Sequence, residues 1–66
     1  MDVQKFKASL VLKGYNNKSF IEASGINKDR YYKVLRKETS FNQSELNRIR
    51  KLLVLNNDEF VSIFFE

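Results

Sequence analysis

Apolar residues recur at helical spacing in five stretches of the chain, and polar residues separate these stretches. In the first stretch, residues 3–13, Phe6 and Leu10 stand four positions apart with lysines around them. This spacing predicts an amphipathic helix, because residues three or four positions apart lie on the same face. Val11 and Leu12 widen its apolar side, so this helix is either deeply buried or partly in contact with a partner.

The second stretch predicts a short helix followed by a tight turn. Asn16 or Asn17 can cap an eight-residue helix, since an asparagine side chain accepts hydrogen bonds from the first backbone N–H groups. Gly25 marks the end of this helix, because glycine readily adopts the positive φ with which many helices stop. After the turn, Ile26 is expected to point inward and Asn27 to cap the next helix.

The third stretch predicts a helix with one apolar and one basic side, ending near Lys37. At about 100° per residue, Tyr31, Val34 and Leu35 fall in one sector. The opposite side carries Asp29, Lys33 and Arg36, with Tyr32 and Lys37 beside them. Two helices joined by a short glycine-containing turn, the second of them basic on its outer side, match the helix-turn-helix motif, whose second helix enters the DNA major groove.

Two asparagines predict where the last two helices begin. Asn42 and Asn56 are each followed three residues later by a glutamate, which is the spacing of a capping box, and Phe41 stands before the first as a staple residue. The fourth helix is expected to close at Leu55. Its inward residues are Leu46, Ile49 and Leu53. No stretch alternates long enough to compete as a strand, so the sequence predicts an all-α fold of five helices in a single domain over residues 1–66.

The segment around the predicted turn resembles the Cro/CI-type (XRE-like) helix-turn-helix of phage regulators. In that pattern, apolar residues frame a central Gly-Ile pair, and the matching positions here are Phe20, Gly25, Ile26, Tyr31 and Val34. The similarity extends from Phe6 to Phe65, in the layout of small Cro-like proteins of Gram-positive phages. Ile21 and Ser24 depart from it, since the family usually has alanine and an apolar residue there. The resemblance implies a five-helix lambda-repressor-like DNA-binding domain with its helix-turn-helix at about residues 17–37.

Composition narrows the possible functions. The 66 residues contain neither cysteine nor histidine, which removes disulfides, thiolate ligands, the commonest general base and the commonest metal ligand. No glycine-rich phosphate loop or motif-placed carboxylate pair is present, so we expect no enzyme, no cofactor and no metal site. The N-terminus is too polar for a secretory signal, and no apolar run approaches the roughly 18 residues of a membrane span. We therefore expect a cytoplasmic protein of a bacterial host cell with no membrane partner.

Charge is distributed unevenly along the chain. Residues 28–51 have a net charge of +5, whereas residues 52–66 have a net charge of −3. Such asymmetry in a small domain indicates one side that faces a polyanion, although an ordinary solvated surface is an alternative. The predicted partner is double-stranded operator DNA. The predicted DNA-binding residues are Asn17, Asn27, Lys28, Asp29, Arg30, Tyr32, Lys33 and Arg36.

Four of these residues, near the start of the third helix, can reach base edges. Asn27 can pair with adenine and Asp29 can accept from cytosine. Lys28 or Arg30 can donate to guanine. Asn27 and Asp29 also have structural alternatives, because the first can be occupied as a helix cap and the second can simply stabilise the positive end of its helix.

The other four residues are better placed for the DNA backbone. Lys33, Arg36 and Tyr32 are expected at phosphates or at the rim of the groove. Asn17, at the amino end of the second helix, can direct its side chain and neighbouring N–H groups at a phosphate. Two alternatives remain for Arg48, Arg50 and Lys51: they form a second set of contacts to the DNA backbone, or they simply lie on a solvated face of their helix.

The apolar residues near the C-terminus suggest a second surface. The last helix has too many of them for one stripe, and Phe60 and Phe64 can close the core over the first helix. The remainder, Ile63, Phe65 and Val61, is expected to form an exposed patch of the kind that marks interfaces. We predict a homodimer whose interface includes Phe60, Ile63, Phe64 and Phe65. Such a dimer would present two recognition helices about 34 Å apart to a palindromic operator.

A second function class fits the same fold. Small phage proteins that resemble it can act as antirepressors, which bind a phage repressor protein and mask its DNA-reading helix. In that case the phenylalanine-rich end or the third helix would be a protein interface, and the affinity for DNA would be weak.

Overall fold

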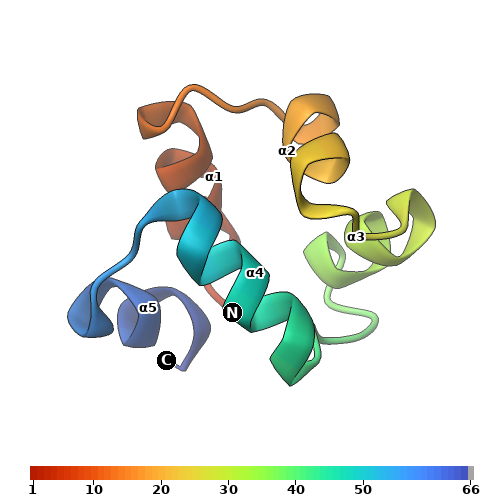
Figure 1. Ribbon diagram of the computed structural model, residues 1–66. Helices are drawn as coiled ribbons and strands as arrows, with labels where there is room; N and C mark the ends of the chain where they lie inside the picture. Colours follow the sequence, from red (N-terminus) through yellow and green to blue (C-terminus); the bar gives the residue numbers. More distant parts are fainter. Residues whose placement is uncertain (66) are drawn as a thin grey trace.

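The computed structural model describes residues 1–65 and folds them into five α-helices, with no strand within that range (Figure 1). The helices are α1 (Val3–Leu12), α2 (Asn17–Ser24), α3 (Lys28–Leu35), α4 (Gln43–Leu53) and α5 (Asn57–Phe64). The predicted all-α class with five helices is therefore confirmed. In Figure 1, α4 crosses the middle of the molecule, with α1 and α5 on one side of the view and α2 and α3 on the other.

Asparagine caps determine where four of the helices begin. Each cap accepts a hydrogen bond from the backbone N–H three residues later, at 2.8 to 3.1 Å, and the caps are Asn16, Asn27, Asn42 and Asn56. For α4 and α5 the glutamate of the predicted capping box also accepts from the backbone N–H of the cap. Each such cap contributes typically about 1 kcal/mol. The sequence allowed either Asn16 or Asn17 as the cap of α2, and the structure shows that Asn16 is the cap.

Two helices end earlier than predicted. The last residue of α3 is Leu35, two residues before Lys37, and α4 ends at Leu53 rather than Leu55. In both cases a residue with positive φ follows, Lys37 at 63° and Val54 at 51°. The chain reverses there, and later N–H groups bond back to open carbonyls of the last helical turn. The sequence carries no glycine at either place to announce the stop.

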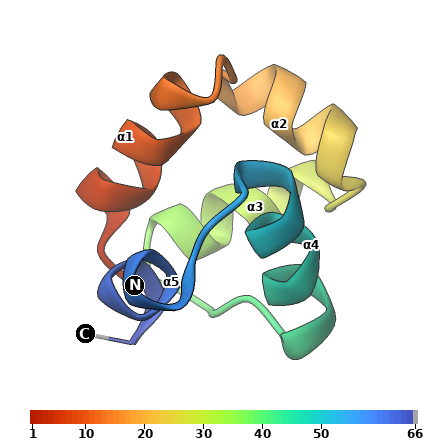
Figure 2. The same ribbon diagram turned by 60° about the vertical axis from the view of Figure 1, so that its left-hand side comes forward.

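The core is organised around Phe6, which is completely buried. Its ring lies 5.8 to 6.2 Å from the rings of Phe20, Tyr31, Phe41 and Phe64, measured between centroids. These neighbours come from α2, α3, the loop before α4, and α5, so one side chain of α1 contacts residues of several other elements. Figure 2 shows the same arrangement of helices from another side. Deleting such an aromatic side chain typically costs about 3–5 kcal/mol.

Polar contacts attach the first residues to the last described helix. The backbone N–H of Asp2 donates to the carbonyl of Ile63 at 2.7 Å, and the Lys5 ammonium donates to the Ser62 hydroxyl at 2.8 Å. These bonds add to the packing of α1 on α5. They keep the C-terminal helix close to Phe6, whose ring lies 6.1 Å from that of Phe64.

Candidate nucleic-acid interface

The two sides of α3 have the character that its sequence predicts. Tyr31 and Val34 are buried in the core, and Leu35 is partly buried against it. The exposed residues of this helix and its flanks are Asn27, Lys28, Asp29, Lys33, Arg36 and Lys37. Three predicted contact residues with positive charge, Lys28, Lys33 and Arg36, therefore lie at the surface. A polyanion can approach them without any rearrangement of the core.

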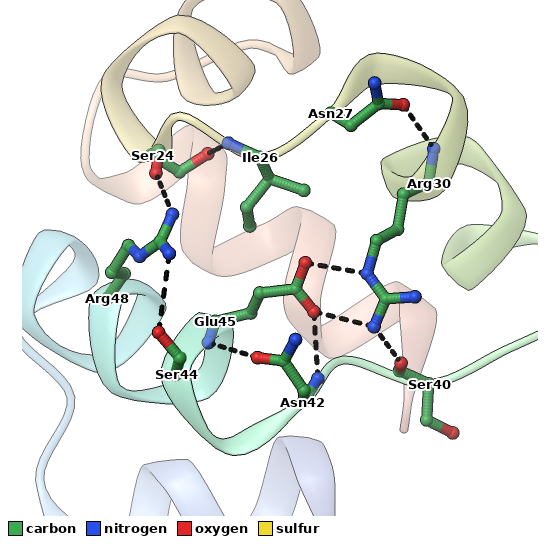
Figure 3. A network of polar contacts seen from close by, with 9 residues as sticks. All are labelled: Ser24, Ile26, Asn27, Arg30, Ser40, Asn42, Ser44, Glu45 and Arg48. Carbon is green, nitrogen blue, oxygen red and sulfur yellow. Dashed lines mark hydrogen bonds and ion pairs between the residues drawn. The ribbon is translucent and has the colours of Figure 1, made fainter.

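The turn between α2 and α3 is held from both sides. Gly25 has φ 70°, as predicted, and the Ser24 hydroxyl accepts from the N–H of Ile26 at 3.3 Å. The same hydroxyl donates to the Ile21 carbonyl at 3.3 Å. From α4, the Arg48 guanidinium donates to the Ser24 carbonyl at 3.1 Å (Figure 3). The buried Ser24 thus bonds the turn to the helix before it.

Arg30 is bound within the protein. Its guanidinium donates to both carboxylate oxygens of Glu45, at 2.7 and 2.8 Å, and to the Ser40 carbonyl at 2.8 Å (Figure 3). Glu45 also accepts from the backbone N–H of Asn42 at 2.8 Å. The hydrogen bonds from Arg30 lower the pKa of Glu45 despite its burial, and Glu45 in turn raises the pKa of Arg30. The prediction that Arg30 reads a guanine does not fit this arrangement, because its donors are already directed at a carboxylate.

Arg36 differs from Arg30 in its surroundings. It pairs with Glu38, and 57% of the Arg36 side chain and 51% of the Glu38 side chain are exposed. Ion pairs this exposed contribute little and exchange readily with other partners. Arg36 therefore remains available to a phosphate, whereas the Glu45 side chain that holds Arg30 is only 8% exposed.

The basic residues of α4 are mostly used inside the protein. Besides its bond to the turn, Arg48 donates to the Ser44 hydroxyl at 3.4 Å. Arg50 bonds to Asn57 and lies over the Phe60 ring, 5.2 Å from its centroid. Lys51 is exposed. The two arginines are thus neither free for a DNA clamp nor merely solvated, because they connect α4 with the α2–α3 turn and with α5.

Two predicted polar contacts have structural roles as well. The Asn27 side chain accepts from the Arg30 N–H at 3.1 Å, so its oxygen serves as the cap of α3. The Asn17 side-chain oxygen accepts from the Tyr31 hydroxyl at 2.9 Å, which leaves its amide N–H groups as the donors for a ligand. Burial raises the pKa of Tyr31 to about 12, with a smaller contribution from Tyr32, whose ring centroid lies 5.4 Å away.

Two hollows flank α3 and are lined by the predicted DNA-binding residues other than Asn17 and Arg36. One, of about 460 Å³, is lined by Asn27, Asp29, Arg30, Lys33, Glu38 and Thr39. The other, of about 330 Å³, lies between α2 and α3 and is lined by Lys18, Ile21, Glu22, Lys28 and Tyr32. Lys18 was not among the predicted residues. The sequence did contain one indication of it: Lys18 lies in the first turn of a helix, where the helix dipole disfavours positive charge, so a cation there suggests a role other than helix stability.

The predicted C-terminal surface is smaller than expected. Phe60 is 9% exposed and closes the core as expected, and this burial does not fit its further assignment to the dimer interface. Ile63 is 3% exposed, so its expected place in the exposed patch is wrong. These two residues and Phe64 are spaced at i, i+3 and i+4, and this side of α5 packs inward. Phe64 is partly buried, and Phe65 is 60% exposed. Phe65 borders a hollow of about 350 Å³ that reaches from α5 to the end of α3.

Comparisons with known proteins give no match: no protein-family model, no curated protein and no solved structure matches this chain. Within residues 1–65, none of the helices has the length and apolar character needed to cross a bilayer. In the same range, no three acidic side chains gather in a way that could hold a metal ion. The function is therefore inferred from the geometry of α2, α3 and α4.

Proposed function

We propose that this protein is a sequence-specific DNA-binding regulator of transcription. In this proposal α2 and α3 form a helix-turn-helix of the lambda-repressor-like kind, and α3 enters the major groove of operator DNA. The observation that carries it is the arrangement of α3, in which Tyr31 and Val34 are buried while Lys28, Lys33 and Arg36 are exposed on the remaining surface. A helix anchored by one side and basic on the other suits a groove lined by phosphates.

The proposed contacts are distributed along α3. Lys28 and Asp29, both exposed in the first turn, are assigned to guanine and cytosine. Lys33, further along the helix, and Arg36, just past its end, are assigned to phosphates. Asn27 keeps its cap and can offer only its amide N–H groups to a base. Tyr32 lines a hollow together with Lys18 and Lys28 and is assigned to the DNA backbone there. Asn17 is assigned to a DNA phosphate near the amino end of α2.

We also propose that two copies bind one operator. The apolar residues available for this contact are Phe65 and Val61, which are exposed, and the partly buried Phe64. Two symmetric copies would place their α3 helices about one DNA turn apart, near 34 Å, and the operator would be roughly palindromic.

The proposal is tested by selecting duplexes from a randomised library and measuring affinity for the selected duplex at two salt concentrations. A protein that contacts several phosphates loses affinity by orders of magnitude between about 50 and 200 mM salt. Lys33→Ala should weaken binding to all duplexes and lower the salt slope by about 0.9, the value for one phosphate. Lys7→Ala, which removes an exposed lysine of α1, is the matched control and should leave the slope unchanged.

The antirepressor alternative predicts a different outcome. Weak binding to every duplex, with no dependence on salt, would favour a protein partner over DNA. In that case Phe65 and the hollow beside it offer the exposed apolar surface that a protein interface needs.

A further inference from the structure

Arg30 stands among residues assigned to DNA but is directed away from it. It lines the same hollow as Asn27, Asp29 and Lys33. Its guanidinium nevertheless makes two bonds to the Glu45 carboxylate, and a third to the Ser40 carbonyl, all between 2.7 and 2.8 Å. A cation close to the proposed DNA surface is thus neutralised by the carboxylate of Glu45, a residue of α4.

We propose that Glu45 determines specificity by withholding Arg30 from DNA phosphates, an inference that depends on the proposed function. A guanidinium fits a phosphate as well as it fits a carboxylate, because both offer two oxygens to its fork of donors. Phosphate contacts strengthen binding to every duplex and carry no sequence information. Removing one such contact from each chain lowers the affinity for unrelated DNA and preserves the contacts that read bases.

The structure explains why Arg30 stays with Glu45 when DNA arrives. The Glu45 side chain is only 8% exposed, and the N–H of Asn42 holds its carboxylate in place as part of the α4 capping box. A phosphate that took Arg30 would leave this carboxylate buried without its cation, which is strongly unfavourable. The Ser40 carbonyl holds the guanidinium from a further side. Arg36 lacks such a restraint, since the carboxylate of Glu38 is half exposed.

The test measures binding to a random-sequence duplex, for which no operator is needed. Glu45→Gln removes the negative charge and keeps a side-chain oxygen for the Asn42 N–H. The released Arg30 should steepen the salt slope by about 0.9 per chain, which over a fourfold rise in salt is an additional loss of about 3.5-fold in affinity. At 50 mM salt the variant should bind the random duplex more tightly than wild type does. Library selection with it should give a less defined consensus sequence.

Two further variants identify the cause. Arg30→Gln in the otherwise unchanged protein should leave the slope on random DNA as in wild type, because Arg30 is already withheld. The double variant Arg30→Gln with Glu45→Gln should lose the gain shown by Glu45→Gln alone. Glu38→Gln is the matched control. It deletes the same charge beside the hollow that Arg30 lines, but its partner Arg36 is already accessible, so the slope should change little.

Each outcome decides the question. Circular dichroism at the binding temperature establishes that each variant is folded. If either single variant is not, the double variant decides, because it leaves neither charge unpaired: its slope should equal that of wild type, and a slope lower by about 0.9 would overturn the inference. A steep wild-type slope combined with equal slopes for wild type and folded Glu45→Gln would overturn the inference and leave the proposed function intact. A slope for Arg30→Gln that is lower by about 0.9 would also overturn it, since Arg30 would then contact DNA in the wild type. A flat wild-type slope would overturn both proposals.

Discussion

Replacing Val54 with asparagine is expected to stabilise the protein. Val54 follows the last residue of α4 with φ 51° and ψ 53°. Few residues other than glycine adopt this left-handed region, and a β-branched side chain does so only under strain. Asparagine is found there several times more often, because its short polar side chain can bond locally. The Val54→Asn substitution should therefore relieve strain without changing the path of the chain.

The expected gain follows from the conformation and the exposure of Val54. A left-handed backbone costs an ordinary L-residue about 1–2 kcal/mol. The side chain is 73% exposed, so its removal forfeits only a minor part of the roughly 1.5 kcal/mol that full burial of a valine provides. The net gain is about 0.5–1 kcal/mol. A single core of this size typically supplies only about 3–5 kcal/mol, so the change is a large fraction of the total.

Urea denaturation followed by circular dichroism measures this gain. With a slope near 1 kcal/mol per molar urea, the midpoint should rise by about 0.5–1 M. Val11→Asn is the matched control, because Val11 is also exposed but lies within α1, where there is no left-handed strain to relieve. That variant should lower the midpoint slightly. If Val54→Asn lowers it as well, the strain argument is wrong, and the Val54 side chain contributes more packing than its exposure indicates.

Three other outcomes follow from the structure. The pKa of Glu45 is lowered in the folded state, so its ionised carboxylate stabilises the protein fully above the unfolded pKa, near 4.3. This contribution is lost as the pH falls through the lower folded pKa. Acid titration should therefore reduce the difference in free energy of unfolding between wild type and Glu45→Gln. The pKa of Tyr31 is raised to about 12, so the free energy of unfolding should fall by up to about 3 kcal/mol as the pH rises from about 10 to 12. Tyr31→Phe should remove this pH dependence in alkaline unfolding followed by circular dichroism. Sedimentation of the free protein at micromolar concentration should show a dimer that Phe65→Ser dissociates and that Val11→Ser, an exposed apolar residue of α1, leaves intact; a monomeric wild type would contradict the dimer.

The starts of the helices could be predicted from the sequence because their causes are local. A side chain at the cap bonds to a backbone N–H only three residues away, and Asn27, Asn42 and Asn56 all do so as expected. Gly25 likewise acts through its own φ. The inward positions of α3 also followed from spacing, since Tyr31 and Val34 lie on one face wherever that helix packs.

Other features depend on contacts between distant residues, and the sequence could not indicate them. The ion pair of Arg30 joins residues 15 positions apart, and nothing in either helix by itself shows that they meet. Ile63 was expected at the surface because α5 has more apolar residues than one stripe needs, and only the docking of α5 on α1 decides which of them turn inward. The early end of α4 depends on Val54 adopting a backbone conformation that its residue type disfavours.

The contrast between the two arginines of this region supports the proposal that two copies bind one operator. The strongest single readout in the major groove is an arginine fork on guanine. Arg30, at the start of α3, is bound to the buried Glu45, and Arg36 lies just past the end of the helix beside the exposed Glu38. Base reading is therefore left to Lys28 and other short or singly pointing donors, which lack the planar fork. Such a half-site reads few bases, so we expect discrimination to come from two sources: a low affinity for unrelated DNA, because Arg30 is kept from phosphates, and a second half-site bound by a second copy.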